Sequence, residues 1–327
     1  MSKMEKTLGY NLDKIDRKIL FELDKNCRVS STKLARLVNK SRQTVEYRIN
    51  NLVKNGIITG FKASVNPHKL GKKLYKIYLN LKNIKQKKVE LFEFLRRSNQ
   101  VYWIGECSGM WDMIFGIFAE DNIDFWNFKN RLISNFRDII LEEKGDEIVE
   151  VNQFPKMYFT GEQSDSTTFG GKVITNILDK KDMEILSVIS REARSNVVEI
   201  AEKTNTTPSI VMTSLKKMEE KKIIIQYRLE VDIDKLGLEN YKILIELNKF
   251  SHSDALRLIG FCSRHKEVQY LIRDMWNIEI EIVVGNSQDY YAFVEELKTQ
   301  FPNVIKTLNN ALIIRDEWTT GFENLFK

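Results

Sequence analysis

The chain carries the same pattern twice. Residues 12–71 align without a gap on residues 178–237, an offset of 166 positions, and 16 of the 60 aligned pairs are identical. Both segments open with Leu-Asp-Lys and close with Lys-Leu-Gly. A repeat of this length exceeds the period of a solenoid, so it predicts a duplicated pair of domains. A chain of 327 residues is long enough to bury the cores of such a pair.

Positive charge is concentrated at the start of the first copy. Residues 1–80 hold 18 Lys and Arg against 6 Asp and Glu, a net charge of +12, whereas the whole chain carries +6. One basic segment in an otherwise acidic or neutral chain indicates a polyanionic partner. A lysine-rich surface that served only solubility would not need to gather at one end.

Composition excludes several classes of protein. Hydrophobic residues make up 43% of the chain and charged residues 29%, as in ordinary soluble proteins. No apolar run approaches the ~18 residues of a membrane span, and the polar start does not resemble a signal peptide. We therefore expect a cytoplasmic protein with no membrane partner. Its three cysteines and three histidines lack metal-ligand spacing, so we expect no disulfide framework, metal site or cofactor.

Residues 13–55 show the signals of three short helices. The spacing of apolar residues predicts the first helix over 13–26. Serines stand where the next two helices begin, Ser30 or Ser31 for the second and Ser41 for the third. A serine at such a position accepts hydrogen bonds from free backbone N–H groups and so caps the helix.

The connections between these helices predict a DNA-binding motif. A tight turn at Asn39–Lys40 joins the last two helices into a helix-turn-helix. The third helix is expected to end at Asn55, because Gly56 suits the left-handed residue that follows a helix. Residues 57–65 then predict two short strands around Thr59–Gly60, a small wing.

Beyond Gly71 the pattern changes to alternating strands and helices. The expected segments, in the order βαββαβ, are 74–81, 89–95, 101–107, 113–119, 125–136 and a strand within 139–159. Further strands are expected at 241–247, 268–272 and 278–284. The predicted fold class is α+β, a winged helix-turn-helix followed by a βαββαβ ferredoxin-like module, duplicated in tandem. The expected domains are a helix-turn-helix (1–70), an effector and oligomerisation module (71–160), a linker (161–171), a second, degenerate helix-turn-helix (172–237) and a second module (238–327).

The third helix divides into an apolar face and a polar face. At 100° per residue, Val45, Ile49 and Leu52 fall together and are expected to pack on the other helices. The polar face can hydrogen-bond base edges and hold phosphates. The predicted DNA-binding residues are Lys40, Arg42, Gln43, Thr44, Glu46, Tyr47, Arg48, Asn50 and Lys54. The alternative is a three-helix bundle whose charged face has no nucleic-acid partner.

The run LDKIDRKILFELDKNCRVSSTKLARLVNKSRQTVEYRINNLVKNGIITGFKASVNPHKLG resembles the N-terminal domain of the Lrp/AsnC (feast/famine) transcriptional regulators. The positions that carry the resemblance are Leu12, Asp13, Asp16, Arg28, Leu34, Ala35, Ser41, Val45, Arg48, Ile49, Leu52, Gly56, Ile58, Gly60, Leu70 and Gly71. The later stretch VYWIGECSGMWDMIFGIF resembles that family's glycine-containing turn between the central strands. The likeness is clear in the first half of the chain and fainter in the second.

This resemblance implies how the chain assembles and what it senses. Members of the family dimerise by stacking their sheets and bind a small ligand, often an amino acid, between such modules. The predicted effector-binding residues are Ser108, Gly109, Met110, Trp111 and Asp112. A glycine in this turn permits a positive φ or a close approach of ligand, and it has no counterpart in the second copy. The alternative is an ordinary hairpin turn.

The second copy departs from the first at the predicted reader. Ser209, Met212, Thr213, Lys216 and Glu220 stand where the first copy has Gln43, Glu46, Tyr47, Asn50 and Lys54, and Pro208, Ser214 and Lys222 replace Arg42, Arg48 and Gly56. Proline suits the first turn of a helix, so the fold is expected to persist. Phosphate affinity scales with the charges neutralised and should be weak here. We interpret this copy as a structural or partner-binding remnant, and the alternative is a second DNA reader of different specificity.

These observations predict a sequence-specific DNA-binding transcriptional regulator, not an enzyme. The two modules are expected to fold against each other within one chain, and two chains to join as a homodimer or larger homo-oligomer on double-stranded DNA. One alternative is an enzyme like the siroheme decarboxylases, which resemble this family and also occur as paired or fused copies. They would need histidine and arginine contacts to a tetrapyrrole, and only Arg273 is present in VQYLIRD. Another alternative is a sensor that acts through another protein without DNA.

Overall fold

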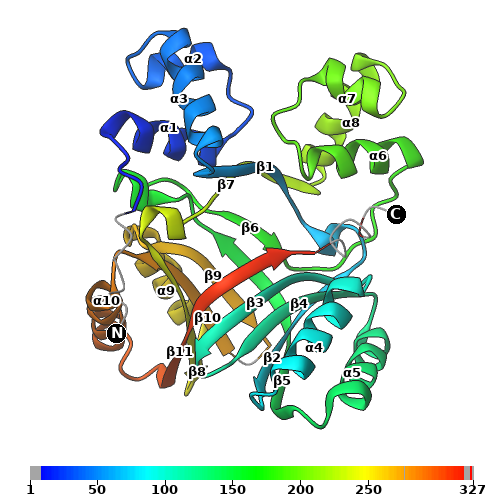
Figure 1. Cartoon of the computed structure of the whole chain (residues 1–327), viewed down its shortest axis with the longest axis vertical. Coiled ribbons are helices and arrows are strands. Elements are labelled where there is room, and N and C mark those ends of the chain that lie inside the picture. The colour runs from blue at the N-terminus through cyan, green and yellow to red at the C-terminus, as the bar shows by residue number, and fades with distance from the viewer. Residues whose placement is uncertain (1–8, 276, 320–324, 326–327) are drawn as a thin grey trace.

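The computed structural model describes residues 9–275, 277–319 and 325, and it shows two helical heads above one β-barrel (Figure 1). Each head is one copy of the repeat's helices. The barrel beneath them is built from both ferredoxin-like modules together. None of the helices in the described residues is long and apolar enough to cross a membrane.

The first head is a three-helix unit whose helices begin where the sequence predicts. They are α1 (Lys14–Lys25), α2 (Ser31–Leu37) and α3 (Arg42–Lys54). The side chains of Asp13, Ser30 and Ser41 accept hydrogen bonds from backbone N–H groups at the three helix starts. Apolar residues of all three helices are buried together, among them Leu20, Leu34 and Val45.

The second head repeats this arrangement. Its helices are α6 (Lys180–Ile189), α7 (Val197–Lys203) and α8 (Pro208–Glu220), and their N-caps are Asp179, Asn196 and Thr207. Pro208 occupies the first turn of α8, where its missing N–H costs nothing. Its own apolar cluster includes Ile185, Ile200 and Val211. The prediction that the fold persists in this copy is confirmed.

The predicted wing is wrong in its pairing. Instead of a hairpin around Thr59–Gly60, the chain forms one strand, β1 (Ile58–Val65), which pairs antiparallel with β7 (Ile224–Val231) of the other copy. Phe61 lies opposite Leu229 in this ribbon. Strand pairing is a non-local choice, and the repeat supplies a partner for β1 that no single copy contains. The two wings thus join the two heads.

Both modules follow the predicted βαββαβ order. The first consists of β2 (Lys73–Leu81), α4 (Lys85–Arg97), β3 (Val101–Gly109), β4 (Met113–Ala119), α5 (Asn122–Phe136) and β5 (Ile140–Gln153). The second consists of β8 (Glu239–Leu247), α9 (His252–Arg264), β9 (Val268–Asp274), β10 (Asn277–Val284), α10 (Ser287–Gln300) and β11 (Ile305–Trp318). Short 3₁₀ turns span Pro67–Lys69, Met157–Phe159 and Asp234–Leu236. Part of the predicted linker is strand, because Thr167–Gly170 forms β6 beside β5.

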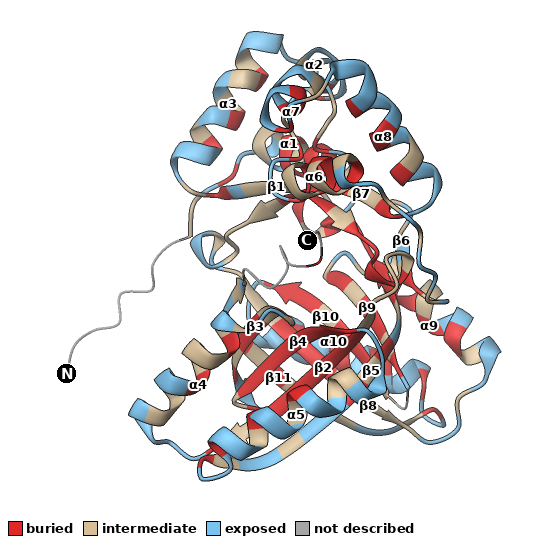
Figure 2. Ribbon diagram, turned by 90° about the vertical axis from the view of Figure 1, so that its right-hand side faces the viewer, coloured by how far each residue is buried: buried red, intermediate tan, exposed pale blue. Residues whose placement is uncertain are grey.

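The two modules close into one ring of strands. Their order is β2-β4-β3-β11-β8-β10-β9-β5, and β5 pairs back with β2. The long strands β5 and β11 each pair with β2 or β8 of their own module and then cross to β9 or β3 of the other. The ring is largely buried, and helices such as α4 and α5 cover its outside (Figure 2). The expectation that the modules fold against each other within one chain is confirmed.

Candidate nucleic-acid interface

The face of α3 predicted to read DNA is open to solvent. Val45, Ile49 and Leu52 are buried against α1 and α2, which turns the opposite side of the helix outward. Gln43, Asn50 and Lys54 are exposed there, and the Tyr47 side chain is 72% exposed. Amide and phenol groups presented in this way can reach donors and acceptors on base edges.

Arg42 and Glu46 form an exposed pair one helical turn apart. The Arg42 Nε donates to Glu46 Oε1 at 2.8 Å. This hydrogen bond holds the pKa of Glu46 below its ordinary value and raises that of Arg42. An exposed i,i+4 pair contributes little to stability, so the guanidinium can exchange its partner for a phosphate or a base at small cost.

Arg48 points toward the body of its own head. Its Nη1 donates to Asp13 Oδ2 at 2.7 Å and to Asp16 Oδ1 at 2.8 Å, which ties α3 to the start of α1. These hydrogen bonds raise the pKa of Arg48. The structure therefore places this predicted DNA-binding residue in a contact that orients α3.

The two remaining predicted residues lie just before α3 and in its first turn. Lys40 is exposed in the turn before α3, next to Asn39 with its positive φ of 52°. The hydroxyl of Thr44 lies 2.8 Å from that of Ser41 and so belongs to the helix cap. Lys40 is thus free to face a polyanion, whereas Thr44 helps to begin the helix.

The matching face of α8 has different chemistry on the same scaffold. Ser209, Met212, Thr213 and Lys216 are exposed, with Met212 at 55%. In place of the Arg48 contact, the Ser214 hydroxyl donates to Asp182 at 2.6 Å. The second head therefore keeps the contact between its first and third helices but exposes hydroxyl groups, a methionine and a single lysine on this face.

The two heads hold each other through a reciprocal pair of arginines. Arg28 donates to the carbonyl oxygens of Ala193 at 2.7 Å and Ser195 at 3.0 Å, and Arg194 donates to the carbonyl of Cys27 at 2.9 Å. Their guanidinium groups also lie over Tyr227 and Phe61 respectively. The identity of these arginines in the repeat was visible in the sequence, but nothing in it indicated that they cross between copies.

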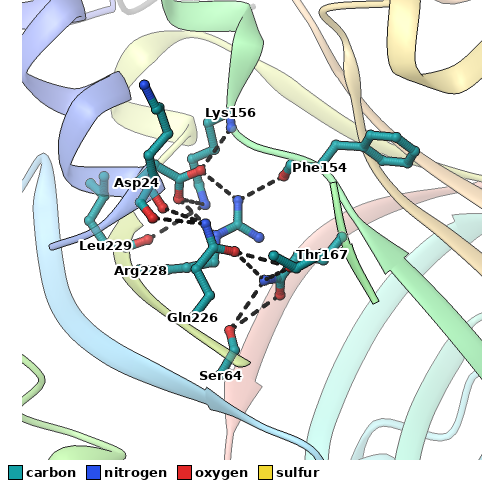
Figure 3. A network of polar contacts seen from close by, with 10 residues as sticks. Asp24, Ser64, Phe154, Lys156, Thr167, Gln226, Arg228 and Leu229 are labelled. Atoms are coloured by element: carbon teal, nitrogen blue, oxygen red, sulfur yellow. Dashed lines mark hydrogen bonds and ion pairs between the residues drawn. The ribbon is translucent and has the colours of Figure 1, made fainter. Parts of the chain in front are cut away.

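The first head is also joined to the barrel by a buried ionic network (Figure 3). Asp24 of α1 is fully buried, and Arg228 of β7 donates to its two oxygens at 3.0 and 2.6 Å. Lys156, after β5, contributes its backbone N–H at 2.8 Å and its ammonium at 3.0 Å. Burial alone would raise the pKa of Asp24, but the two cations hold it below its usual value.

Sequence reasoning missed this junction. Asp24 lies among apolar neighbours of α1, and its position in the second copy holds Ser190. An acid on an otherwise apolar helix stripe was the only available signal. Its partners come from segments more than 130 positions away in the chain.

The turn predicted to bind an effector lies against the second module. Gly109 has a φ of +126°, and a Cβ there would lie 2.6 Å from the carbonyl oxygen of Asn310 in β11. The backbone N–H of Met110 donates to the same carbonyl at 2.9 Å. The glycine is thus required by close packing of two strands.

The other predicted effector residues divide between core and surface. Trp111 is buried, and the Asp112 carboxylate accepts a hydrogen bond from Leu81 N at 2.7 Å. Ser108 is exposed and Met110 is 38% exposed. Met110 and Trp111 border a cavity of about 30 Å³, enough for about one water molecule.

Comparison with known proteins agrees with the duplicated heads. The family model described as winged helix-turn-helix DNA-binding matches residues 12–59 and again 178–225. The HTH-type transcriptional regulator Ptr1 of Methanocaldococcus jannaschii is 38% identical over 104 residues, which cover 32% of this chain and 69% of that protein. The leucine-responsive regulatory protein of Escherichia coli K12 is 40% identical over 70 residues, 21% of this chain and 43% of that protein.

The chain is therefore a duplicated winged helix-turn-helix protein, and it belongs to the Lrp/AsnC family of transcriptional regulators. A solved structure shares its whole architecture. The crystal structure of the siroheme decarboxylase NirDL superposes with a TM-score of 0.62 at 13% identity, covering 96% of this chain and 97% of that one. At that identity the likeness shows the fold alone.

Proposed function

We propose that this chain regulates transcription by binding a specific DNA sequence through α3 of its first head. The observation that carries the proposal is the contrast between α3 and α8. On one scaffold, α3 exposes Gln43, Tyr47 and Asn50, whereas α8 exposes Ser209, Thr213 and Lys216 at the same positions. The net charge of +12 over residues 1–80 supplies the attraction to phosphates.

The contacts divide these residues into three roles. Arg42, Gln43, Tyr47 and Asn50 would meet base edges in the major groove, which distinguishes all four base pairs. Lys40 and Lys54 would hold phosphates on either side. Residues bonded within the head would position α3, and these are Thr44, Glu46 and Arg48.

The proposal is tested by selecting sequences from a random duplex library with the full chain. Enriched duplexes should bind much more tightly than random ones, and the affinity for both should fall steeply as salt rises, because counterions are released. Equal affinity for all duplexes would contradict sequence-specific reading. Absence of duplex binding at low salt would contradict DNA binding and favour a sensor that acts through another protein.

We also propose that the turn 108–112 binds a small effector and that this binding changes how the heads bind DNA. Chains are further proposed to associate into homo-oligomers on DNA. The turn contacts β11, so a ligand there would act on both modules at once. Ser108 and Met110 are its accessible side chains. The single amino acids form the first test set, and a ligand is expected to raise the unfolding temperature or change the mass of the DNA-bound particle. A role on chromosomal DNA corresponds to the expected cytoplasmic location.

A second candidate function is decarboxylation of a siroheme-like tetrapyrrole, favoured by the fold shared with NirDL over nearly the whole chain. The side chains give it less support than DNA binding. Arg273 forms an ion pair with Glu150, and the strands of the barrel carry or adjoin large buried side chains such as Trp111 and Lys242. Incubation with siroheme followed by mass spectrometry tests it, since each lost carboxylate leaves as CO₂.

A further inference from the structure

A buried set of charges lies where the two modules face each other inside the barrel. Lys76 of β2 donates to Glu279 of β10 at 2.6 Å, and the Tyr78 hydroxyl donates to the same carboxylate. Lys242 of β8 is bonded to Glu281 of β10, and its ammonium lies 3.9 Å from Glu279. The side chains of Lys76, Lys242 and Glu279 are at most 5% exposed. Charges removed from water in this way are tolerated only when they are paired.

The repeat shares the lysines but not the glutamates. Lys76 and Lys242 are equivalent positions of β2 and β8. In the second module, the neighbours of Lys242 and Leu244 on β10 are Glu281 and Glu279. In the first module, the neighbours of the equivalent Lys76 and Tyr78 on β4 are Gly116 and Ile114. The first module therefore has a cation and no carboxylate at these four positions.

The number of buried positive and negative charges differs among the three possible pairs of modules. The native pair of unlike modules holds two lysines and two glutamates, which balance with Lys242 protonated; burial lowers the pKa of Lys242, and the bonded Glu281 carboxylate favours its charged form. Two first modules would bury two lysines with neither glutamate. Two second modules would bury two lysines with four glutamates. An unpaired buried charge is strongly destabilising, so both like pairings are unfavourable.

Two further carboxyl groups border the set. Burial raises the pKa of Asp274 to about 7 and also raises that of Asp146. Asp146 of the first module accepts a hydrogen bond from the Asn277 amide of the second at 3.1 Å. The position of Asn277 corresponds to Asp112 in the first module, so a like pair would place an acid where the amide stands.

We infer that the buried charges on the inner faces of the two modules determine which modules pair. Each module forms a stable barrel with the unlike module and not with a second copy of itself. The reciprocal arginines of the heads would not impose this choice. Arg28 and Arg194 each donate to the other head's loop, and two identical heads could do the same. The buried pair of Asp24 with Arg228 also joins unlike halves, so the barrel charges act together with it.

The register of the paired strands allows pairs of identical modules to be detected by a disulfide crosslink. Ile313 of β11 lies opposite Cys107 of β3, and the equivalent Ile148 of β5 lies opposite Asp274 of β9. If two first modules paired, Ile148 of one would lie opposite Cys107 of the other. Residues opposite one another in antiparallel strands are close enough for a disulfide. Ile148→Cys should thus crosslink only in a like pair, and Ile313→Cys only in the native pair.

The experiment uses the full chain, cut after purification at a protease site inserted after Gln163 in the exposed segment between the copies. The cut protein is warmed to let halves exchange, then oxidised and separated on non-reducing gels. Ile313→Cys, the matched control, should join the N-terminal to the C-terminal half. Ile148→Cys should give less than about one tenth of the N-terminal dimer expected from random pairing, which places about half of these fragments in like pairs.

Removing the barrel charges should remove most of the selectivity against pairs of first modules. A variant with Lys76, Lys242, Glu279 and Glu281 replaced by Met, and Tyr78→Phe to avoid an orphan hydroxyl, keeps similar volumes. When this neutral variant also carries Ile148→Cys, the yield of crosslinked N-terminal dimer should be at least about tenfold higher than with the native charged residues. Dimers from the native charges, or none from a folded neutral variant, would overturn the inference.

A milder change keeps the test decisive if that variant does not fold. Glu279→Gln keeps the side-chain volume and gives a pair of second modules two lysines and two glutamates, and Ser190→Asp in the same protein supplies the acid that Arg228 would otherwise lack in that pair. Native mass spectrometry of the cut protein should then show pairs of C-terminal halves that the native residues exclude. Their absence from this double variant would also overturn the inference.

Discussion

The two heads share a scaffold and differ in what they present and how they are attached. Equivalent residues cap all three helices, and reciprocal arginines join the heads. The first head exposes a polar face on its third helix, the proposed DNA reader, and is anchored through a buried acid, Asp24, where the second has Ser190. The comparison teaches that positions which build the fold can stay alike while those that define partner and attachment change.

The largest expected effect concerns attachment. Asp24→Asn should lower the free energy of unfolding by about 3–5 kcal/mol, because it leaves Arg228 and Lys156 buried without their anion. Ser190→Ala in the second head removes one hydroxyl bond to Ser187 and should cost about 1 kcal/mol. Urea unfolding of both variants measures the difference, and equal losses would mean that the heads are attached alike.

The next effect concerns reading. Asn50→Ala or Arg42→Ala should weaken binding to a selected duplex by about 1–3 kcal/mol, roughly 5- to 150-fold, because base-edge contacts are lost. Lys216→Ala, at the position of Asn50 in the second head, should change affinity by less than about twofold. Fluorescence anisotropy titrations at fixed salt compare them. A similar loss for Lys216→Ala would make the second head a reader as well.

The third effect separates the two modules by pH. The pKa of Asp274 is raised to about 7 by burial, and Cys107 occupies the same place in the first module. A carboxyl group with a raised folded-state pKa stabilises fully below its unfolded value near 4 and loses that contribution as pH rises toward 7. Stability should fall by roughly 2 kcal/mol between pH 5 and 7, and Asp274→Asn should flatten this slope. An unchanged slope in urea unfolding would locate the titration elsewhere.

The smallest effect concerns the end of the third helix in each head. Gly56 and Lys222 occupy the same left-handed position, with φ of 67° and 55°. Lysine pays a conformational cost there that glycine does not, so Lys222→Gly should stabilise the protein by about 1 kcal/mol. Gly56→Lys should destabilise it by a similar amount. Thermal unfolding measures both, and a destabilising Lys222→Gly would show that the lysine side chain contributes more than its backbone strain costs.

Local structure could be predicted from the sequence, because its causes lie within a few residues. The helix starts at Asp13, Ser30 and Ser41 and the order of strands in each module follow from caps and periodicity. The pairing of the wing could not be predicted, since β1 pairs with β7, a strand that begins 166 positions later in the chain. The direction of Arg48 was also hidden, because its partners Asp13 and Asp16 come close only when α1 packs on α3.

The sequence by itself determined that the chain is two copies of one plan and that the first copy carries the positive charge and the polar third helix. Tertiary structure alone decided that the copies share one ring of strands, that Asp24 pairs with Arg228, and that Lys76 pairs with Glu279. The reason is physical. Helix caps and amphipathic faces depend on neighbours along the chain, whereas strand pairing and buried charge depend on groups that only folding brings together.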